Sequence, residues 1–409
     1  MNEGKIIKFY REKANLTQEE LGRGICSVTH ISKIERGITE YSPEIAFLLA
    51  KRLGIDIQSE LKRLNGVESL LQQMKNAMDR QKFDEVESII SALKDVPILV
   101  VSKFQIQFHL LLARYYCSQE NHREAMKILS PIKKEMDRLP TYESNLLKHV
   151  LGIYYLTKKN FINAIEILKS IDPNQYKNHE FYYNIAYSYH SIGSKVLAYY
   201  YAEKALNYFK DTNNFNRIID TETLMIVQIG DNEYLNFQET VAQYQSLLQT
   251  CDICHFIDKK TKLLHNFAYN RYLRRELAEA QKLYFEAMQL SEKNSSLFFL
   301  SFEGYIRCSF EGFLLDKDTL TKLVNEGMSL LAKNKNDQLS TILFTMLNYE
   351  ILENTELYHF LDEIAIPFFK ENQLFWLVTQ YEKRLFTYYS ETNQLEKALE
   401  IANSLLKIC

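Results

Sequence analysis

A pattern of paired positions recurs along residues 67–409 and constrains the fold more than any other feature. In each pair a small or apolar residue follows a marker residue after three positions. The pairs are Phe83/Val86, His122/Ala125, Phe161/Ala164, Lys195/Ala198, Leu277/Ala280 and Leu395/Ala398. The second members are separated by 39, 39, 34, 82 and 118 residues, and the last two intervals correspond to two and three units of 39 to 41. Repeats of this length predict an all-α array of stacked helix pairs, about nine in number. The pattern weakens near residues 214–255 and 316–371.

Composition supports helices and excludes several classes of protein. Gly (12) and Pro (6) are scarce, whereas Tyr (27) and Phe (24) are abundant, which favours helices with aromatic packing over a turn-rich β fold. The net charge of -3 excludes a wholly basic nucleic-acid coat. Neither a signal peptide nor a long uncharged apolar run is present, and six scattered Cys do not resemble a disulfide scaffold. We therefore expect a cytoplasmic protein without a membrane span.

Residues 1–65 show a different pattern, with short helices that follow one another closely. Ile7 and Tyr10 mark the first, and Thr17 with Glu20 forms a capping box for the second, whose buried face we expect to continue through Leu21 and Ile25. Ser27 can cap a third helix that buries Ile31 and Ile34. A fourth begins at Ser42-Pro43-Glu44, buries Leu49 and Leu53 and ends at Gly54. This arrangement predicts a helix-turn-helix domain over residues 1–65.

The stretch LTQEELGRGICSVTHISKIERG resembles the DNA-binding domains of the Cro/repressor-like (XRE) class, over about residues 4 to 57. In a helix-turn-helix the third helix enters the major groove with its N-terminal residues near base edges. Thr29 can contact a base edge or a thymine methyl group, and Lys33 can reach a guanine or a phosphate. The candidate base-reading residues are Ser27, Val28, Thr29, His30, Ser32 and Lys33.

The same resemblance implies roles for three further residues. It places Gln18 on a backbone phosphate and pairs Arg11 with Glu35 as a structural ion pair. Residues 1–65 hold eleven Lys and Arg against nine Asp and Glu, so one domain carries little net positive charge and binds weakly. We therefore expect a homodimer that binds two half-sites of palindromic double-stranded DNA, with an affinity that falls steeply with salt.

Residues 66–409 resemble the tetratricopeptide repeat family in the segments LLARYYCSQENHREAMKIL, LGIYYLTKKNFINAIEIL and IAYSYHSIGSKVLAYYYAEKAL. The expected fold is a right-handed superhelix with a concave inner surface that suits an extended peptide. Asn184 and Asn266 lie 82 residues apart in the similar contexts YYNIAYSY and LHNFAYNRY. An asparagine amide can donate and accept at once, as a peptide backbone requires.

The combination of both domains resembles the peptide-pheromone receptors of the Rap, Rgg, NprR, PlcR and PrgX group. This resemblance implies a quorum-sensing transcription regulator whose inner asparagines bind the backbone of a short oligopeptide, which we assign to Asn184 and Asn266. Neighbours by helical spacing or repeat placement complete the predicted peptide-binding residues: Tyr187, Tyr269, Asn270, Tyr305 and Asn348.

Two alternatives use the same domains differently. The repeats could bind a protein of a phosphorelay, as relatives with phosphatase activity do, with Gln72 or Gln73 positioning a water. They could also serve only to dimerise a repressor that has no ligand. The run Cys251-Asp252-Ile253-Cys254-His255 matches a haem-attachment pattern, but no secretion signal accompanies it. A single Cys pair without a second pair is also weak evidence for a zinc site. We expect no cofactor, no metal site and no catalytic activity.

Overall fold

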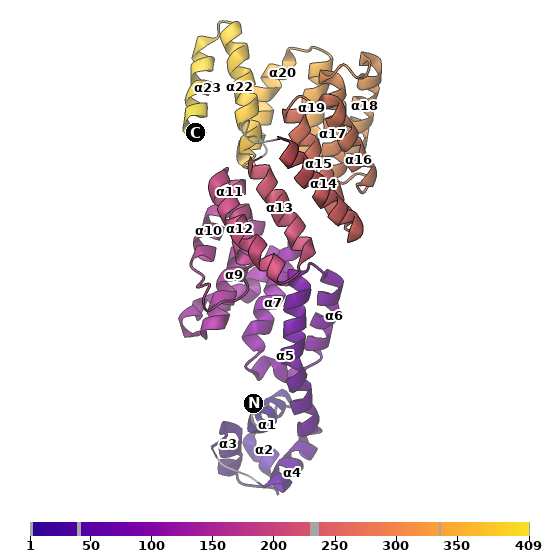
Figure 1. The fold of residues 1–409 in the computed structure, drawn as a ribbon. Helices are drawn as coiled ribbons and strands as arrows, with labels where there is room; N and C mark the ends of the chain where they lie inside the picture. Colours follow the sequence, from indigo (N-terminus) through magenta and orange to yellow (C-terminus); the bar gives the residue numbers. More distant parts are fainter. Residues whose placement is uncertain (1–2, 39–41, 230–236, 335–336, 409) are drawn as a thin grey trace. The chain divides into compact units, whose positions relative to one another are not determined.

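The computed structural model describes residues 3–38, 42–229, 237–334 and 337–408 (Figure 1). These ranges are helical throughout, apart from turns and loops, and contain no β-strand. The all-α prediction is therefore confirmed. None of the described helices combines the length and apolar character that a membrane span requires. The chain divides into two compact units, residues 1–184 and 185–409, which are described separately below.

The N-terminal helices of the first unit surround one apolar core. They are α1 (Glu3–Lys13), α2 (Gln18–Gly22), α3 (Val28–Arg36) and α4 (Pro43–Leu53), followed by the long α5 (Ile57–Asp79). Ile7, Leu21, Ile31, Ile34 and Leu49 are fully buried in this core. As the sequence predicts, Ser42 caps α4 ahead of Pro43, and Gly54 ends the helix at a left-handed φ of 68°.

The second helix is shorter than the sequence predicts. It ends at Gly22, so the expectation that it continues through Ile25 is wrong. The amides of Ile25 and Cys26 both donate to the carbonyl of Gly22 (2.8 and 3.0 Å), and Gly24 adopts a left-handed φ of 74°. A residue with this φ cannot continue an α-helix, so the chain turns towards α3 directly after five helical residues.

Helix α5 runs through Asn65 and Gly66, where the sequence suggests the end of the first domain. Its buried residues include Leu64, Val67 and Leu71, which follow at spacings of three and four and keep one continuous apolar face against the core. Gly66 lies on the exposed side, and a Cβ added there would meet no heavy atom within 4 Å. The division at residues 65–66 is therefore not a break in secondary structure.

Helices beyond α5 alternate in antiparallel order along both units. The first unit continues with α6 (Phe83–Lys94), the 3-10 turn η1 (Pro97–Val101), α7 (Gln105–Ser118), α8 (His122–Lys134), the 3-10 turn η2 (Met136–Arg138), α9 (Thr141–Thr157) and α10 (Phe161–Lys169). Helix α11 (Phe181–Ser191) spans the division between the units. The second unit continues with α12 (Lys195–Asp211), α13 (Phe215–Ile229), α14 (Phe237–Ile253), α15 (Ile257–Leu273), α16 (Leu277–Leu290), α17 (Ser296–Glu311), α18 (Lys317–Lys333), α19 (Gln338–Ile351), α20 (Glu356–Phe360), α21 (Ile366–Glu371), α22 (Phe375–Glu391) and α23 (Leu395–Ile408).

The six marker residues of the sequence pattern are the first residues of helices α6, α8, α10, α12, α16 and α23. Their partners three positions later are buried: Val86, Ala125, Ala164, Ala198 and Ala280 are fully inaccessible, and Ala398 is nearly so. A small side chain at this position lets the second helix of a pair approach the first closely. The helix pairs predicted from the repeat are therefore confirmed at these six places.

One turn geometry joins the two helices of each of these pairs. The residue two positions before each marker has a left-handed φ between 55° and 78°, and the amide that follows it donates to the carbonyl five residues earlier, as from Lys82 to Ala77. This arrangement ends a helix while satisfying its last carbonyls. The left-handed residues are Gln81, Glu120, Lys159, Gly193, Arg275 and Asn393.

The segments where the pattern weakens also contain helices. Residues 214–255 hold α13 and α14, and residues 316–371 hold α18 to α21; residues 230–236 and 335–336 within them lie outside the described ranges. A π-helical stretch, Leu361–Ala365, precedes Pro367. Proline has no N–H to donate to the preceding turn. The wider π turn accommodates this missing bond, and it also shifts the spacing of apolar residues away from the repeat.

Candidate functional sites

The start of α3 is fixed by local caps in the sequence. Thr17 Oγ1 accepts a hydrogen bond from the amide of Glu20 (3.1 Å), and a carboxylate oxygen of Glu20 accepts one from the amide of Thr17 (2.7 Å). This is the predicted capping box of α2. Ser27 Oγ accepts from the amide of His30 (3.2 Å) and caps α3. The Thr17 cap therefore fixes the start of α2, and the Ser27 cap fixes the start of α3 where the turn between the two helices ends.

Most of the candidate base-reading side chains lie on the outer face of α3. Ser27, Val28, Thr29 and Lys33 are exposed, and His30 and Ser32 are half-buried. The opposite face of the helix is anchored by Ile31 and Ile34, so the exposed side chains are presented by a rigid element. Val28 is 44% exposed, which is a large apolar exposure for a structural residue. This face can provide hydroxyl, imidazole and ammonium donors together with an apolar contact.

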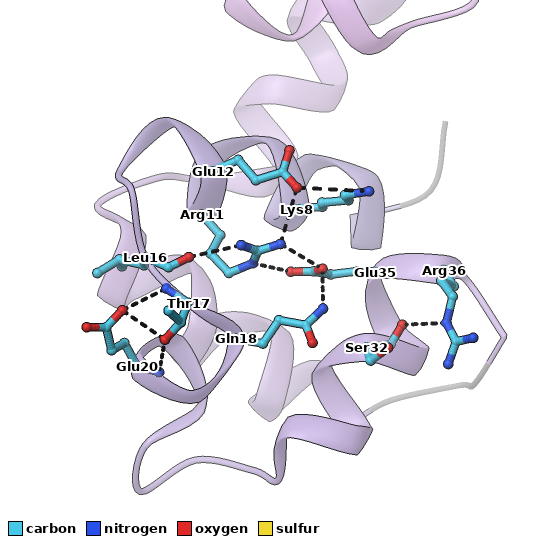
Figure 2. Close-up of polar contacts among 10 residues, drawn as sticks. All are labelled: Lys8, Arg11, Glu12, Leu16, Thr17, Gln18, Glu20, Ser32, Glu35 and Arg36. Atoms are coloured by element: carbon cyan, nitrogen blue, oxygen red, sulfur yellow. Dashed lines mark hydrogen bonds and ion pairs between the residues drawn. The ribbon is translucent and has the colours of Figure 1, made fainter.

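A polar cluster beneath α3 ties three helices together (Figure 2). Arg11 of α1 donates from Nε to Glu35 Oε1 (2.6 Å) and from Nη2 to Oε2 (3.0 Å), and its Nη1 donates to the carbonyl of Leu16 (2.9 Å). The hydrogen bond to Glu35 raises the pKa of Arg11. Gln18 donates from Nε2 to Glu35 Oε2 (2.8 Å). The ion pair implied by the resemblance is thus present, and it sets the position of α3 against α1 and α2.

The resemblance places Gln18 on a backbone phosphate, and in the structure its amide nitrogen donates to Glu35. An amide group carries two N–H donors, so one donor of Gln18 is still available to a phosphate. The same hydrogen bond orients the side chain at the start of α2. Gln18 therefore remains a candidate for phosphate contact, held in place by Glu35.

Two features of this domain were not found from the sequence. Arg52 of α4 donates from Nη1 to the carbonyls of Leu21 (2.8 Å) and Arg23 (2.6 Å), which closes the end of α2. At Gly4 of α1, an added Cβ would lie 1.9 Å from the carbonyl oxygen of Ile34. The backbones of α1 and α3 are therefore in contact there. Both contacts join distant segments, and no local pattern signals them.

Asn184, predicted to bind a peptide, is a buried member of a polar chain in the first unit. It is 7% exposed and donates from Nδ2 to Nε2 of His149 (3.0 Å). Nδ1 of His149 lies 3.0 Å from the hydroxyl of Tyr176, and both of these side chains are fully buried. Because an amide nitrogen only donates, this geometry makes His149 a neutral imidazole with its proton on Nδ1. Asn184 thus has a structural role in the described conformation.

An ion network borders this chain of hydrogen bonds. Arg114 donates to Asp79 (2.8 Å) and to Glu180 (2.6 Å), and all three side chains are largely buried. Burial raises the pKa of Asp79 to about 6, against the opposing charge of Arg114. The network links α5, α7 and the segment before α11.

Asn266 occupies the equivalent position of its own repeat in the second unit. Asn184 and Asn266 each lie eleven residues before the first residue of the following helix, α12 and α16. Asn266 is half-buried, and no described residue hydrogen-bonds its amide. Its environment therefore differs from that of Asn184, and its amide is available to a ligand.

The other predicted peptide-binding residues lie on several helices. Tyr187 of α11 is exposed, Asn270 of α15 is buried, and Tyr269 of α15, Tyr305 of α17 and Asn348 of α19 are half-buried. The ring of Tyr269 lies 5.6 Å from that of Trp376 on α22, in an edge-to-face arrangement, and Tyr305 contacts Phe285 in the same distance range (5.7 Å). Within the second unit the structure thus places Asn266, Tyr269, Tyr305 and Asn348 on first helices of successive pairs.

Other sequence features have ordinary structural positions. Cys251 is buried within α14, and His255 occupies a turn with a left-handed φ of 55°. Gln72 and Gln73 are exposed on α5 and donate to Asn76 (3.0 Å) and Ser69 (3.1 Å) along the same helix. Both side chains are thus exposed and bonded to their own helix, which gives no support to a water-positioning role.

Comparisons with known proteins agree with this architecture. The helix-turn-helix family matches residues 7–59. The transcriptional activator NprA of Geobacillus stearothermophilus is 22% identical over 404 residues, which cover 92% of this chain and 95% of NprA. Among solved structures, the apo form of the quorum sensor NprR from B. thuringiensis has a TM-score of 0.68 and 18% identity, covering 84% of this chain and 99% of NprR.

NprR in complex with its cognate peptide NprX has a TM-score of 0.65 and 19% identity, covering 84% of this chain and 98% of that one. At these identities the structures establish the shared fold, whereas the similarity to NprA extends over nearly the whole sequence. The resemblance predicted from the sequence is therefore confirmed: the chain joins a domain of the helix-turn-helix family to a repeat array with the NprR fold.

Proposed function

We propose that this chain is a cytoplasmic transcription regulator that binds palindromic DNA as a homodimer and is switched by a short peptide bound to its repeats. The observation that carries the proposal is the junction of a helix-turn-helix domain with an NprR-like repeat fold in one chain. The similarity to a transcriptional activator over nearly the whole chain supports the same reading.

The DNA-binding part of the proposal depends on the exposed face of α3. Thr29 and Lys33 project from a helix whose position is set by the Arg11–Glu35 ion pair and by the caps at Thr17 and Ser27. We assign direct base contacts to the N-terminal residues of α3 and phosphate contacts to Lys33 and Gln18. A homodimer supplies two such helices, which compensates for the small net charge of each domain.

The peptide-binding part depends on the second unit. We assign the peptide backbone to Asn266, whose amide is available, and neighbouring contacts to Tyr269, Tyr305 and Asn348. NprR has been solved with its cognate peptide NprX, which supports a peptide ligand for a chain of this fold. Binding changes DNA affinity only if the peptide prefers one of two conformations of the repeats.

Two binding measurements test the proposal. Fluorescence anisotropy with DNA from upstream of the gene, at concentrations well above the Kd, should give two chains bound per palindromic site, and Thr29→Ala with Lys33→Ala should abolish specific binding. Calorimetry with synthetic peptides that tile the product of the neighbouring short reading frame should give one binding peptide. Failure of every peptide to bind would overturn the peptide switch and favour a ligand-independent repressor.

A further inference from the structure

A small cavity opens among the first helices of four successive pairs in the second unit. It has a volume of about 80 Å³ and lies between α15, α17, α19 and α22. We call it the Trp376 pocket and define it by six of its lining residues: Tyr269, Tyr272, Glu303, Arg307, Trp376 and Tyr381. Tyr381 is 3% exposed, whereas Trp376 is 54% exposed. The pocket is therefore buried on one side and accessible beside the indole of Trp376.

The lining of the pocket combines aromatic rings with a neutralised ion network. Arg307 lies 2.6 Å from Glu303 through Nη2 and donates from Nη1 to Glu350 (2.9 Å), and Glu350 is paired with Arg384. Glu311 lies 3.9 Å from the same Nη1 of Arg307 and pairs with Arg275, so three carboxylates and three guanidinium groups balance in this network. The remaining walls are mainly tyrosine rings, the indole, Leu300, Leu343 and Leu377, with Gly304 and the polar side chains of His265 and Gln380 between them. A binding site with such walls favours a neutral, apolar group.

The volume of the cavity and the charges in its lining restrict which chemical group can bind there. A water molecule occupies about 30 Å³ of liquid, and a cavity of about 150 Å³ holds benzene. A cavity of about 80 Å³ therefore suits a branched aliphatic group of a few carbons. Aromatic rings also attract cations, but the carboxylates of this network are already paired with the guanidinium of Arg307, which leaves no free negative charge for a ligand cation. The Nε and Nη1 of Arg307 donate to Glu303 (2.7 Å) and Glu350 (2.9 Å), and the negative charges of these two carboxylates disfavour a further carboxylate.

The pocket is continuous with the predicted peptide-binding residues. Tyr269 belongs to both, and Asn266, Tyr305 and Asn348 lie on α15, α17 and α19, three of the helices that form the pocket. The edge-to-face contact between Tyr269 of α15 and Trp376 of α22 joins two residues that lie 107 positions apart in the sequence. An exposed indole over an apolar cavity gains buried surface when a ligand covers it.

We propose that the Trp376 pocket selects the signalling peptide by receiving one small aliphatic side chain, of the size of valine or proline, beneath the indole of Trp376. This inference rests on the proposed peptide-binding function and adds a specificity determinant to it. Asn266 holds the peptide backbone, which is common to all sequences. The pocket distinguishes one side chain from others by size and by lack of charge.

Trp376 is the one tryptophan of the chain, so its fluorescence reports on this pocket alone. The probes are synthetic peptides that tile the product of the neighbouring short reading frame, measured in parallel by calorimetry and by tryptophan emission. We expect the peptide that binds in calorimetry to shift the emission of Trp376. Replacing its buried aliphatic residue by glycine should weaken binding about tenfold and remove the shift.

Variants of α22 separate the pocket from general effects. Trp376→Ala should weaken binding about tenfold, and its effect should not add to that of the glycine-substituted peptide. Phe386→Ala is the matched control, because Phe386 is an exposed aromatic residue of the same helix outside the pocket. The Phe386→Ala variant should bind the peptide with the affinity of the wild type. Trp376→Phe keeps an apolar ring and should retain most of the affinity.

The outcomes separate the pocket from the peptide function. A peptide that binds the wild type and Trp376→Ala equally, without a change in emission, overturns the pocket and leaves the peptide switch standing. A peptide whose lysine or aspartate substitution at the critical position binds more tightly overturns the aliphatic assignment. If no peptide binds the wild type, the proposed function fails, and the inference that rests on it fails with it.

Discussion

Arg11 in α1 and Glu35 in α3 form a buried two-point ion pair, with Nε to Oε1 at 2.6 Å and Nη2 to Oε2 at 3.0 Å. The side chain of Glu35 is 3% exposed, and it also accepts a hydrogen bond from Gln18. One carboxylate therefore joins the first three helices of the DNA-binding domain.

Arg11→Ala should destabilise the N-terminal domain by about 3–5 kcal/mol, because it leaves the buried Glu35 carboxylate without its charge partner. Hydrogen exchange of the α1 and α3 amides measures the loss. Lys8→Ala is the matched control: Lys8 lies on the same helix and pairs at 3.9 Å with the exposed Glu12. Its effect should stay within about 0.5 kcal/mol. Equal effects of the two substitutions would contradict the proposed role of the pair.

Gly4→Ala should lower the stability of the N-terminal domain, whereas Gly66→Ala should raise the stability of α5. At Gly4 an added Cβ meets the carbonyl of Ile34 at 1.9 Å, so α1 and α3 must separate and DNA affinity should fall. At Gly66 the added Cβ meets nothing within 4 Å in the middle of α5. Alanine there should stabilise the helix by about 1 kcal/mol. Thermal unfolding and DNA anisotropy of both variants check these signs, and unchanged DNA binding by Gly4→Ala would refute the close contact.

Thr29→Ala and Lys33→Ala should weaken DNA binding in different ways. Loss of a base contact at Thr29 should cost about 1–3 kcal/mol on the specific site and relax the preference at one base position. Loss of a phosphate contact at Lys33 should weaken binding to all DNA sequences. It should also reduce the slope of log K against the logarithm of the salt concentration by about 1 per domain. Anisotropy titrations at several salt concentrations separate the two effects. If both variants showed the same changes in sequence preference and salt dependence, the assignment of a base contact to Thr29 and a phosphate contact to Lys33 would be wrong.

Asn184→Ala and Asn266→Ala should separate stability from ligand binding. Asn184→Ala removes the donor to buried His149 and should lower the stability of the first unit by about 1–3 kcal/mol. Asn266→Ala removes no hydrogen bond within the described residues, so its stability should be close to that of the wild type while peptide affinity falls. Thermal unfolding and calorimetry provide both readouts. A large loss of stability in Asn266→Ala would argue against its assignment to the peptide.

The stability of the second unit should fall in mild acid because of His265. Burial lowers the pKa of His265 to about 4, and its Nδ1 lies 3.0 Å from Ser301 Oγ. An unfolded histidine has a pKa of about 6.5. The unfolded chain therefore binds the proton first, and stability is lost as the pH falls from about 6.5 towards 4. Thermal unfolding at pH 7.5 and pH 5 should show a smaller drop for His265→Gln than for the wild type.

Local features of this fold were predictable because their causes are local. The caps at Thr17, Ser27 and Ser42 depend on residues three positions apart, and the sequence predicts all three helix starts. The marker residues at Phe83 and Leu277 also predict helix starts, because the residue three positions later, Val86 or Ala280, is buried against the preceding helix. The apolar spacing of Leu21 and Ile25 predicts that α2 extends to Ile25. The helix ends at Gly22 instead, because Gly24 adopts a left-handed conformation that an α-helix cannot continue through.

Features that depend on distant contacts were not predictable. Asn184 and Asn266 occupy equivalent repeat positions, but His149, 35 residues before Asn184, turns the first into a buried structural residue. Nothing in the spacing of the two asparagines signals this partner. The Trp376 pocket likewise depends on α15 and α22, whose approach to one another is a property of the folded array. Repeat equivalence therefore predicts the position of a side chain better than its environment.

The coupling between peptide and DNA tests the central claim most directly. Anisotropy should measure the affinity of the chain for a palindromic upstream site, first alone and then with saturating amounts of the peptide identified by calorimetry. A peptide-switched regulator should change its DNA affinity by about 5-fold or more, in either direction. Equal DNA affinity with and without a saturating, tightly bound peptide would contradict the account.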